Sequence, residues 1–232
     1  MQPDELVALF DQQAPGYDRQ WARTAAIRDC LYQLLDPLLS DLRENARVLC
    51  VGVGTGQELA HLATTFPGWE FVAVDPSGAM IDACRARAEA EGFAARCRFH
   101  RGFLDSLPAA APFDAATCFL VSQFIVDRSR RVRFFADIAA RLRTGGLLAS
   151  SDLACDTASP AYAVLLPAWM RMMAAAEVSP EALQRIREAY ARDVAVLPPQ
   201  DVAAILEAGG FDAPVPFFQA GLIHAWVSRT PA

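Results

Sequence analysis

Residues 48–58 read VLCVGVGTGQE, an apolar run that meets three glycines at alternate positions and continues into an apolar pattern of helical spacing. A buried strand, a glycine turn and a helix start in this order are typical of a nucleotide-binding α/β domain. Glycine lets the backbone turn sharply and lets a ligand approach closely, and the helix start offers unpaired N–H groups. The spacing is G-x-G-x-G, which differs from the G-x-G-x-x-G of dinucleotide-binding proteins.

The segments after this turn alternate between strand and helix patterns. Apolar runs predict strands at 47–51, 70–74, 96–101, 113–120 and 147–153. Helical patterns lie between them at 56–65, from an N-cap at Ser77 to Glu91, and at 130–142. The alternation predicts an α/β fold, a doubly wound, Rossmann-like parallel sheet with right-handed crossovers.

The chain on either side of this core is predicted to be mainly helical. Residues 3–12 and 21–42 form N-terminal helices, the second bent near Pro37. Residues 160–176 and 179–194 form two cap helices, and a helix at 198–208 leads to a hairpin of 215–219 and 222–228. We therefore expect a single domain in four parts: N-terminal helices (1–44), a cofactor-binding core (45–155), a helical cap (156–195) and a closing helix and hairpin (196–232).

The composition argues against several kinds of partner. The formal net charge is −6, which disfavours nucleic acid, and we interpret the arginines at 128, 130, 131 and 133 as the solvated first half of a helix. No apolar run approaches the roughly 18 residues that span a bilayer. The first residues lack the features of a secretory signal, so we expect a cytoplasmic protein. Six cysteines without a C-x-x-C pair and three histidines predict no metal site.

The topology predicts where a ligand binds. In an open α/β sheet, ligands lie beyond the carboxyl ends of the strands, so four segments converge there: 52–56, 75–76, 102–105 and 119–123. Asp75 ends the second strand, and its carboxylate is placed to accept from both hydroxyls of a ribose. The alternative for Asp75 is a turn or a helix cap.

Over residues 45–155 the sequence resembles the class I S-adenosylmethionine-dependent methyltransferases, through VLCVGVGTG, FVAVDPSGAM, GFLDSLP, FDAATCFLVSQFI and LRTGGLLASSDL. The resemblance implies a seven-stranded sheet with a reversed last strand and S-adenosylmethionine as the cofactor. It also implies the cofactor-binding residues: Gly52, Val53, Gly54, Thr55 and Gly56 at the methionine part, Asp75 at the ribose, Pro76 and Met80 beside the adenine, Gly102, Phe103 and Leu104 along its edge, and Phe119 at the end of the fourth strand.

The sequence departs from the family pattern at two positions. Cys50 stands where the family usually has an acidic residue, which removes a carboxylate partner for the methionine ammonium. Phe103 stands where the family often has Asp, which removes an acceptor for the adenine amine.

A narrower resemblance is to carboxy-S-adenosylmethionine synthase, which modifies the cofactor itself. It rests on Pro15-Gly16-Tyr17, on Gln123-Phe124, and on Gly210-Phe211 with Phe218-Gln219. This resemblance implies that Tyr17 closes over the cofactor and that Arg187 is placed to pair with an additional carboxylate. The alternative for Arg187 is an arginine on the surface of a helix.

The expected activity is methyl transfer to a small molecule. The apolar cap, with Tyr162 and Trp169, predicts an acceptor pocket to which Gln123 and Arg187 are also assigned, although the same pattern fits a packed core. No catalytic base is predicted, since His224 has the pattern of a core or edge histidine. A cofactor-modifying enzyme, a catalytically silent binding protein and, more remotely, a nicotinamide enzyme stay open, as does a homodimer.

Overall fold

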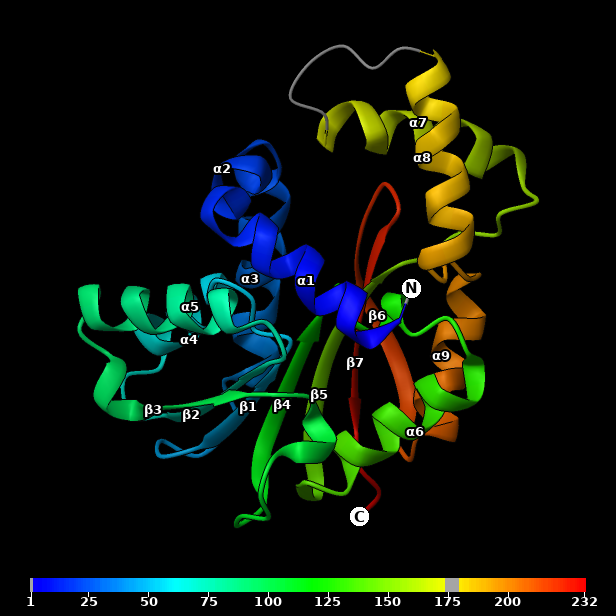
Figure 1. Cartoon of the computed structure of the whole chain (residues 1–232). Coiled ribbons are helices and arrows are strands. Elements are labelled where there is room, and N and C mark those ends of the chain that lie inside the picture. Colours follow the sequence, from blue (N-terminus) through cyan, green and yellow to red (C-terminus); the bar gives the residue numbers. More distant parts are fainter. Residues whose placement is uncertain (1, 174–179) are drawn as a thin grey trace.

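One seven-stranded sheet organises the chain (Figure 1), which is described by a computed structural model over residues 2–173 and 180–232. The strand order is β3-β2-β1-β4-β5-β7-β6, and β7 runs antiparallel to both of its neighbours. This arrangement confirms the predicted class I fold with its reversed last strand. The strands are β1 (Arg47–Val51), β2 (Glu70–Asp75), β3 (Cys97–Arg101), β4 (Phe113–Phe119), β5 (Leu142–Leu153), β6 (Asp212–Ala220) and β7 (Ile223–Arg229).

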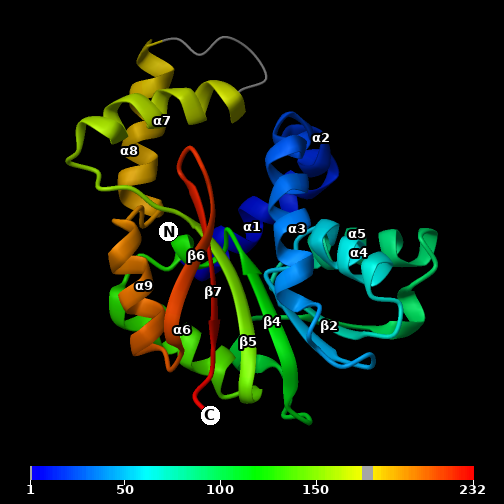
Figure 2. The same cartoon turned by 180° about the vertical axis from the view of Figure 1, so that it is seen from behind.

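Helices cover both faces of the sheet and extend beyond its carboxyl edge (Figures 1 and 2). They are α1 (Pro3–Gln13), α2 (Tyr17–Trp21), α3 (Ala25–Leu39), α4 (Gln57–Thr65), α5 (Gly78–Ala90), α6 (Arg128–Ala139), α7 (Pro160–Met173), α8 (Pro180–Asp193) and α9 (Pro199–Ala208). The predicted ends of the cap helices at 174–176 and 179 lie outside the described residues.

The core follows from the alternation of side chains along the buried strands. In β1, Val48 and Cys50 face a layer built from α3, α4 and α5, whereas Leu49 and Val51 face α6 and α9. A third apolar cluster joins α7 to the end of β5 and to the hairpin of β6 and β7. The cap therefore packs over the carboxyl ends of the strands, where the site was expected.

The N-terminal segment also reaches this edge of the sheet. Ser77 caps α5 as predicted, with its hydroxyl oxygen accepting from Met80 N at 3.1 Å. Asp11 of α1 accepts from the Ser77 hydroxyl at 2.5 Å and from Ala79 N at 3.1 Å. The Asp11 carboxylate lies at the start of α5, where it interacts favourably with the positive end of the helix dipole. Its two hydrogen bonds hold α1 against the start of α5.

Several predicted boundaries are wrong. The helix expected at 130–142 ends at Ala139, and β5 begins at Leu142 instead of 147, because Leu142 already pairs with Phe113. An irregularity that includes Gly145, with φ 67°, then separates this pair from the next one, Ala115 with Leu147. The helix expected at 21–42 occupies only α3, since a 3₁₀ turn at Ala22–Thr24 precedes it. A pattern of apolar spacing does not distinguish a helix from the turns that flank it.

The prediction that the arginines of α6 are solvated is wrong for Arg131, which is fully buried. Its Nε donates to Ser122 Oγ at 2.8 Å, and its Nη2 forms an ion pair with Asp152 Oδ2 at 3.0 Å, outside hydrogen-bond geometry. Asp152 also accepts from the Ser122 hydroxyl. The cluster ties α6 to the end of β5 and to the loop after β4.

Three further expectations concern ligands and surroundings. All six cysteines are free, and among them Cys30 is exposed. Within residues 2–173 and 180–232, no group of at least three His, Cys, Asp or Glu residues is placed to hold a metal ion. Over the same ranges, no helix combines the length and the apolarity that a bilayer crossing requires.

Candidate functional site

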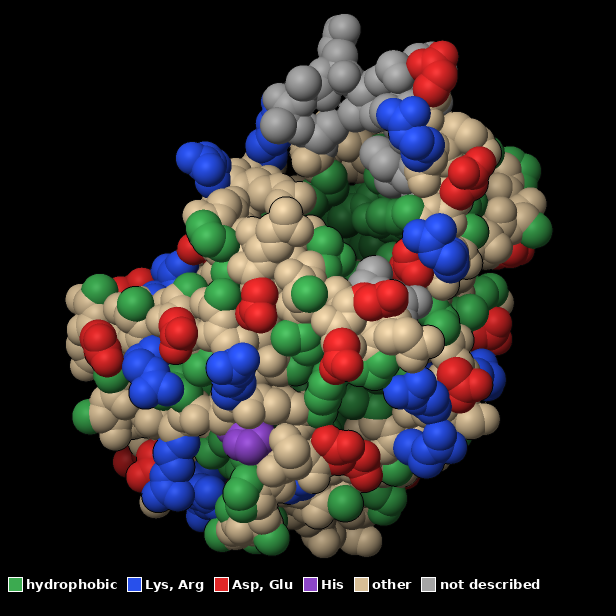
Figure 3. Space-filling model, in the orientation of Figure 1, with side chains coloured by type: hydrophobic (Ala, Val, Ile, Leu, Met, Phe, Trp, Pro, Cys, Tyr) green, Lys and Arg blue, Asp and Glu red, His purple; other side chains and the backbone are tan. Residues whose placement is uncertain are grey.

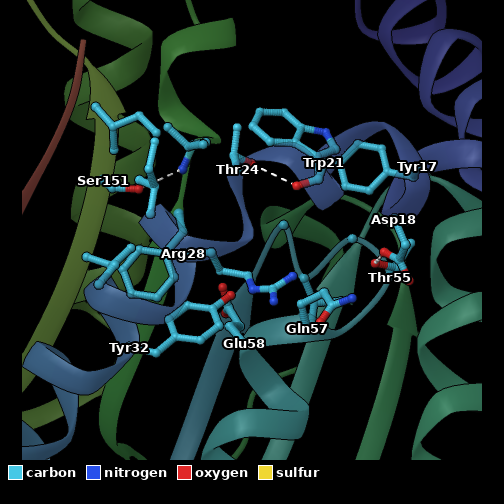
Figure 4. Close-up of a pocket in the computed structure, with 18 residues that line it drawn as sticks. Tyr17, Asp18, Trp21, Thr24, Arg28, Tyr32, Thr55, Gln57, Glu58 and Ser151 are labelled. Atoms are coloured by element: carbon cyan, nitrogen blue, oxygen red, sulfur yellow. Dashed lines mark hydrogen bonds between the residues drawn. The ribbon is translucent and has the colours of Figure 1, made fainter. Parts of the chain in front are cut away.

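A cavity of about 140 Å³ lies beside the glycine turn, at the carboxyl ends of β1, β4 and β5 (Figure 4). The N-terminal helices α2 and α3 form one wall, and the turn and the start of α4 form another. Polar side chains of its lining are Tyr17, Asp18, Thr24, Arg28, Tyr32, Thr55, Gln57, Glu58 and Ser151, and the apolar lining includes Trp21, Ile27, Leu31, Val53, Phe119, Leu120 and Ile223.

The three glycines of the turn have different roles. All three have positive φ angles, of 67° at Gly52, 54° at Gly54 and 82° at Gly56. A Cβ at Gly52 would lie 2.3 Å from the Val121 side chain, and one at Gly56 would lie 2.6 Å from Cys84 Sγ, so the packing of the fold requires both. A Cβ at Gly54 would meet no heavy atom within 4 Å. Gly54 is therefore the glycine that faces open space, where a ligand can approach the backbone.

Asp75 ties the glycine turn to the second strand. Its Oδ2 accepts from Gly54 N and its Oδ1 accepts from Ser77 N, both at 2.9 Å. Burial raises the pKa of this carboxyl, and the two backbone hydrogen bonds oppose the rise. Asp75 does not line the cavity itself, but it contacts the turn residue that does. Each carboxylate oxygen has a second lone pair, so these bonds leave it able to accept from a ligand.

The segment around Tyr17 closes one side of the cavity. Asp18 accepts from the Thr55 hydroxyl at 2.6 Å and from Arg87 of α5, whose Nε donates to Thr55 O at 2.9 Å. Tyr17 packs against Trp21 with ring centroids 5.8 Å apart, and burial with the nearby Asp75 raises its pKa. These contacts hold α2 against the glycine turn.

Glu58 lies on the cavity wall, and the sequence pattern did not single it out. It is the second residue of α4 and is 6% exposed, with its Oε1 accepting from the Thr117 hydroxyl of β4 at 2.5 Å. Burial raises the pKa of Glu58 to about 7, although hydrogen bonds from Thr117 and Cys50 oppose the rise. A signal was present, because Glu58 occupies a position of α4 that faces the apolar core.

Two further lining residues are a cation on α3, Arg28, and a residue with a strained backbone after β4, Leu120. Figure 4 shows the Arg28 side chain extending toward Tyr32, Gln57 and Glu58, while its Nε and Nη2 donate to the exposed Asp29. Leu120 has φ 57°, a left-handed conformation that is costly for a branched side chain, and its N–H donates to Ser151 O at 2.8 Å. This outlier lies where β4 ends at the cavity.

The predicted cofactor residues divide into two groups. Those that line the cavity are Tyr17, Gly52, Val53, Gly54, Thr55 and Phe119. The others do not line it: Gly56, Asp75, Pro76, Met80, Gly102, Phe103 and Leu104. Within the second group, Gly102 N donates to Asp75 O at 3.0 Å, Phe103 is 42% exposed, and Met80 and Leu104 are buried.

A second cavity of about 610 Å³ lies under the cap. Tyr162 and Leu166 of α7, Arg187 and Tyr190 of α8, and the segment 194–197 line it. In the space-filling view, the surface between the cap and the N-terminal helices is hollowed and its floor is hydrophobic (Figure 3).

The predicted acceptor residues are not all at this second cavity. Tyr162 and Arg187 line it. Trp169 lies between the two cavities, because its ring packs 6.0 Å from that of Trp21 and its Nε1 donates to the Tyr190 hydroxyl at 3.0 Å. The Gln123 side chain lines neither cavity, and its Oε1 accepts from Leu153 N at 2.7 Å.

His224 has the structural role expected of it. The ring Nδ1 lies 3.1 Å from Leu222 O, and the ring stacks on Trp226 with centroids 5.9 Å apart. Burial lowers its pKa, and it lines neither of the two cavities. It is therefore not a candidate base.

Comparison with known proteins finds similarity to methyltransferases in the core. Residues 48–146 match the model of a methyltransferase domain family. A protein-L-isoaspartate O-methyltransferase of Methylorubrum populi is 45% identical over 74 residues, which are 32% of this chain and 34% of that protein. The chain thus spans about a third of the length of that curated relative.

Solved structures share the fold at low identity. An O-methyltransferase family protein from Burkholderia thailandensis superimposes with a TM-score of 0.60 at 17% identity, covering 91% of this chain and 60% of that one. The (4+2)-cyclase SpnF superimposes with a TM-score of 0.61 at 15% identity, covering 87% of this chain and 81% of that one. The fold is therefore shared by proteins with different named activities, and the site must decide between them.

Proposed function

From the match of residues 48–146 to a methyltransferase domain family, we propose that the chain transfers the methyl group of S-adenosylmethionine to a small molecule. The observation that carries the proposal is the cavity at the glycine turn, where an accessible Gly54 backbone and aromatic walls meet. When bound, the cofactor supplies an electrophilic methyl group on a sulfonium.

The residues present fit such a cofactor. Gly54 leaves room for close approach, and Asp75 at the end of β2 offers two carboxylate oxygens for the two hydroxyls of a ribose. Tyr17 and Trp21 supply a lid that excludes water, held down by the Asp18 contacts. We assign cofactor binding to these residues together with Val53, Thr55 and Phe119 of the same cavity.

We assign the acceptor to the space under the cap. Its lining is mostly apolar with the hydroxyls of Tyr162 and Tyr190, as a pocket for a small aromatic or aliphatic molecule requires. Arg187 at its edge would pair with an acidic group of the acceptor.

The chemistry places modest demands on the protein. Holding a nucleophile in line with the methyl carbon supplies up to about 7–11 kcal/mol of the barrier reduction. Because no histidine lines either cavity, we assign the acceptor as an atom that attacks without a histidine base, such as a phenolate or a neutral amine.

The cofactor-modifying alternative lacks support from the geometry. Arg187, which would pair with an additional carboxylate, lines the second cavity and not the one at the glycine turn. Mass spectrometry of the ligand retained on purification separates the two readings, because a carboxylated cofactor has a different mass. A protein that binds S-adenosylmethionine but yields no methylated product in an acceptor screen would be a silent binding protein or an enzyme of another class.

The direct test of the site is calorimetry with S-adenosylmethionine. We expect Asp75→Ala to weaken binding at least tenfold, about 1.4 kcal/mol, because the ribose hydroxyls lose a charged acceptor. Asp82→Ala, an exposed carboxylate on α5, is the matched control and should bind like the wild type. Equal affinity of Asp75→Ala and wild type would refute the ribose assignment, and absence of binding by the wild type would refute the proposed function.

A further inference from the structure

A carboxyl group from a neighbouring helix lies in the same layer as Cys50. Cys50 pairs in register with Thr117 of β4, and its side chain faces the layer of α3 and α4. Glu58 of α4 enters the same layer and accepts from the Thr117 hydroxyl, and the Cys50 thiol is among the groups that affect its pKa. A carboxyl group therefore occupies the place beside the end of β1, and it faces the cavity.

The surroundings of Glu58 do not neutralise a negative charge. The titratable groups that face it are thiols or phenols: Cys50 of β1, Cys84 of α5, Cys118 of β4 and Tyr32 of α3. Across the cavity lie Tyr17 and Asp18 of α2 and Arg28 of α3. Among the described residues that line the cavity, Arg28 is the one cation, and its ion pair is with Asp29.

A buried carboxylate without a cation is costly, so the group holds a proton until a cation arrives. The raised pKa of Glu58, about 7, agrees with this reading. Glu58 lines the cavity, so a cation bound there can reach the carboxyl, while the buried core residues include Cys50 and Leu59.

We propose that Glu58 receives the ammonium of the amino-acid end of S-adenosylmethionine and releases its proton when this ammonium binds, while Arg28 receives the carboxylate of the same end. The proposal rests on the proposed function. The proton balance is simple: the Glu58 O–H bond breaks, the proton passes to the buffer, and the ammonium keeps its three hydrogens. Arg28 exchanges its exposed partner Asp29 for the carboxylate of the ligand.

The test counts protons. Calorimetric titration with S-adenosylmethionine at pH 6.0, in buffers of different ionisation enthalpy, gives the number of protons released on binding. We expect close to one proton at this pH. Titrations are kept at or below pH 6.5, because an α-amino group has a pKa of about 7.7–8.0 and stays protonated there.

Affinity should also depend on pH with a defined sign. Below the pKa of Glu58, the deprotonated fraction of its carboxyl falls by close to tenfold for each pH unit. The affinity for S-adenosylmethionine should therefore fall by close to tenfold between pH 6.5 and 5.5. Glu58→Gln should bind at least tenfold more weakly at pH 6.5, with no proton release and a flat pH dependence. Glu70→Gln, an exposed carboxyl on β2, should behave like the wild type.

A truncated ligand controls for the fold of the variant. 5′-Methylthioadenosine lacks the amino-acid end, so it should bind Glu58→Gln and wild type equally and release no proton. Arg28→Met should weaken S-adenosylmethionine binding but leave the proton count near one. Binding to wild type without proton release at pH 6.0 would overturn the role of Glu58 and leave the proposed function intact, whereas no binding at any pH would overturn both.

Discussion

Replacing Arg131 by Met should unfold the protein at markedly lower denaturant concentration. Arg131 and Asp152 are both fully buried, and the ion pair between them spans 3.0 Å. Methionine has a similar length and no charge, so the substitution keeps most of the packing and leaves Asp152 with the Ser122 hydroxyl as its side-chain partner. Removing one member of a buried ion pair typically costs about 3–5 kcal/mol. We expect a loss in this range at pH 7.5.

The pH dependence of that loss identifies its cause. Burial already raises the pKa of Asp152, and Arg131 is the main group that opposes the rise. Without Arg131 the folded-state pKa rises further above the unfolded value, so acid relieves the penalty as Asp152 takes up a proton. The difference in unfolding free energy between Arg131→Met and wild type should therefore shrink from pH 7.5 to pH 5.5.

Urea unfolding followed by circular dichroism measures both effects, with coincident fluorescence transitions as the check on two-state behaviour. Arg133→Met is the matched control, since Arg133 is exposed on the same helix and its loss should change stability by less than about 0.5 kcal/mol. The double variant Arg131→Met with Asp152→Asn should be more stable than Arg131→Met alone. A cost below 1 kcal/mol, or a cost that does not fall in acid, would refute the buried-pair reasoning.

Two further predictions concern the turn and the cap. Gly52→Ala should lose about 1–3 kcal/mol more stability than Gly54→Ala, because only at Gly52 does a Cβ collide with Val121. Thermal unfolding of the two variants measures the difference. Similar losses would contradict the distinction between glycines required for packing and the glycine that faces the ligand. Trp169→Phe removes the hydrogen bond to Tyr190 but keeps an aromatic ring, so once an acceptor is known its KM should rise about fivefold with unchanged cofactor affinity. An unchanged KM would exclude Trp169 from acceptor binding.

Local signals predicted the core of the fold accurately. Strand β1 matches its predicted bounds of 47–51, and Ser77 caps α5 as expected. Both depend on features within a few residues, an uninterrupted apolar run and a hydroxyl before a helix. The start of β5 was missed because Gly145 and Gly146 suggest a turn, whereas the pairing of Leu142 with Phe113 is a contact between distant parts of the chain.

The site was predicted less completely than the fold, because it depends more on contacts between distant parts of the chain. Tyr17 and the glycine turn were assigned to the cofactor from short motifs and the family resemblance, and Tyr17 and residues 52–55 line the cavity. Trp21, Arg28 and Tyr32 were not, because their place depends on how α2 and α3 pack against the turn. The motif residue Asp75 was placed at the correct strand end, although its two observed hydrogen bonds are to the backbone of its own neighbourhood.

Two charged residues lie on apolar helix faces, and their surroundings differ in a way that bears on function. Arg131 shares its face of α6 with Phe135 at four residues' distance, as Glu58 shares its face of α4 with Leu62. A buried charge in such a position needs a counter-charge. Asp152 supplies the counter-charge of Arg131, so this charge is balanced within the folded chain. Glu58 has hydroxyl, thiol and phenol neighbours, with no ion pair among the described residues, and it opens onto a cavity. Within the described residues Glu58 has no counter-charge, which agrees with the proposal that a cationic ligand supplies one.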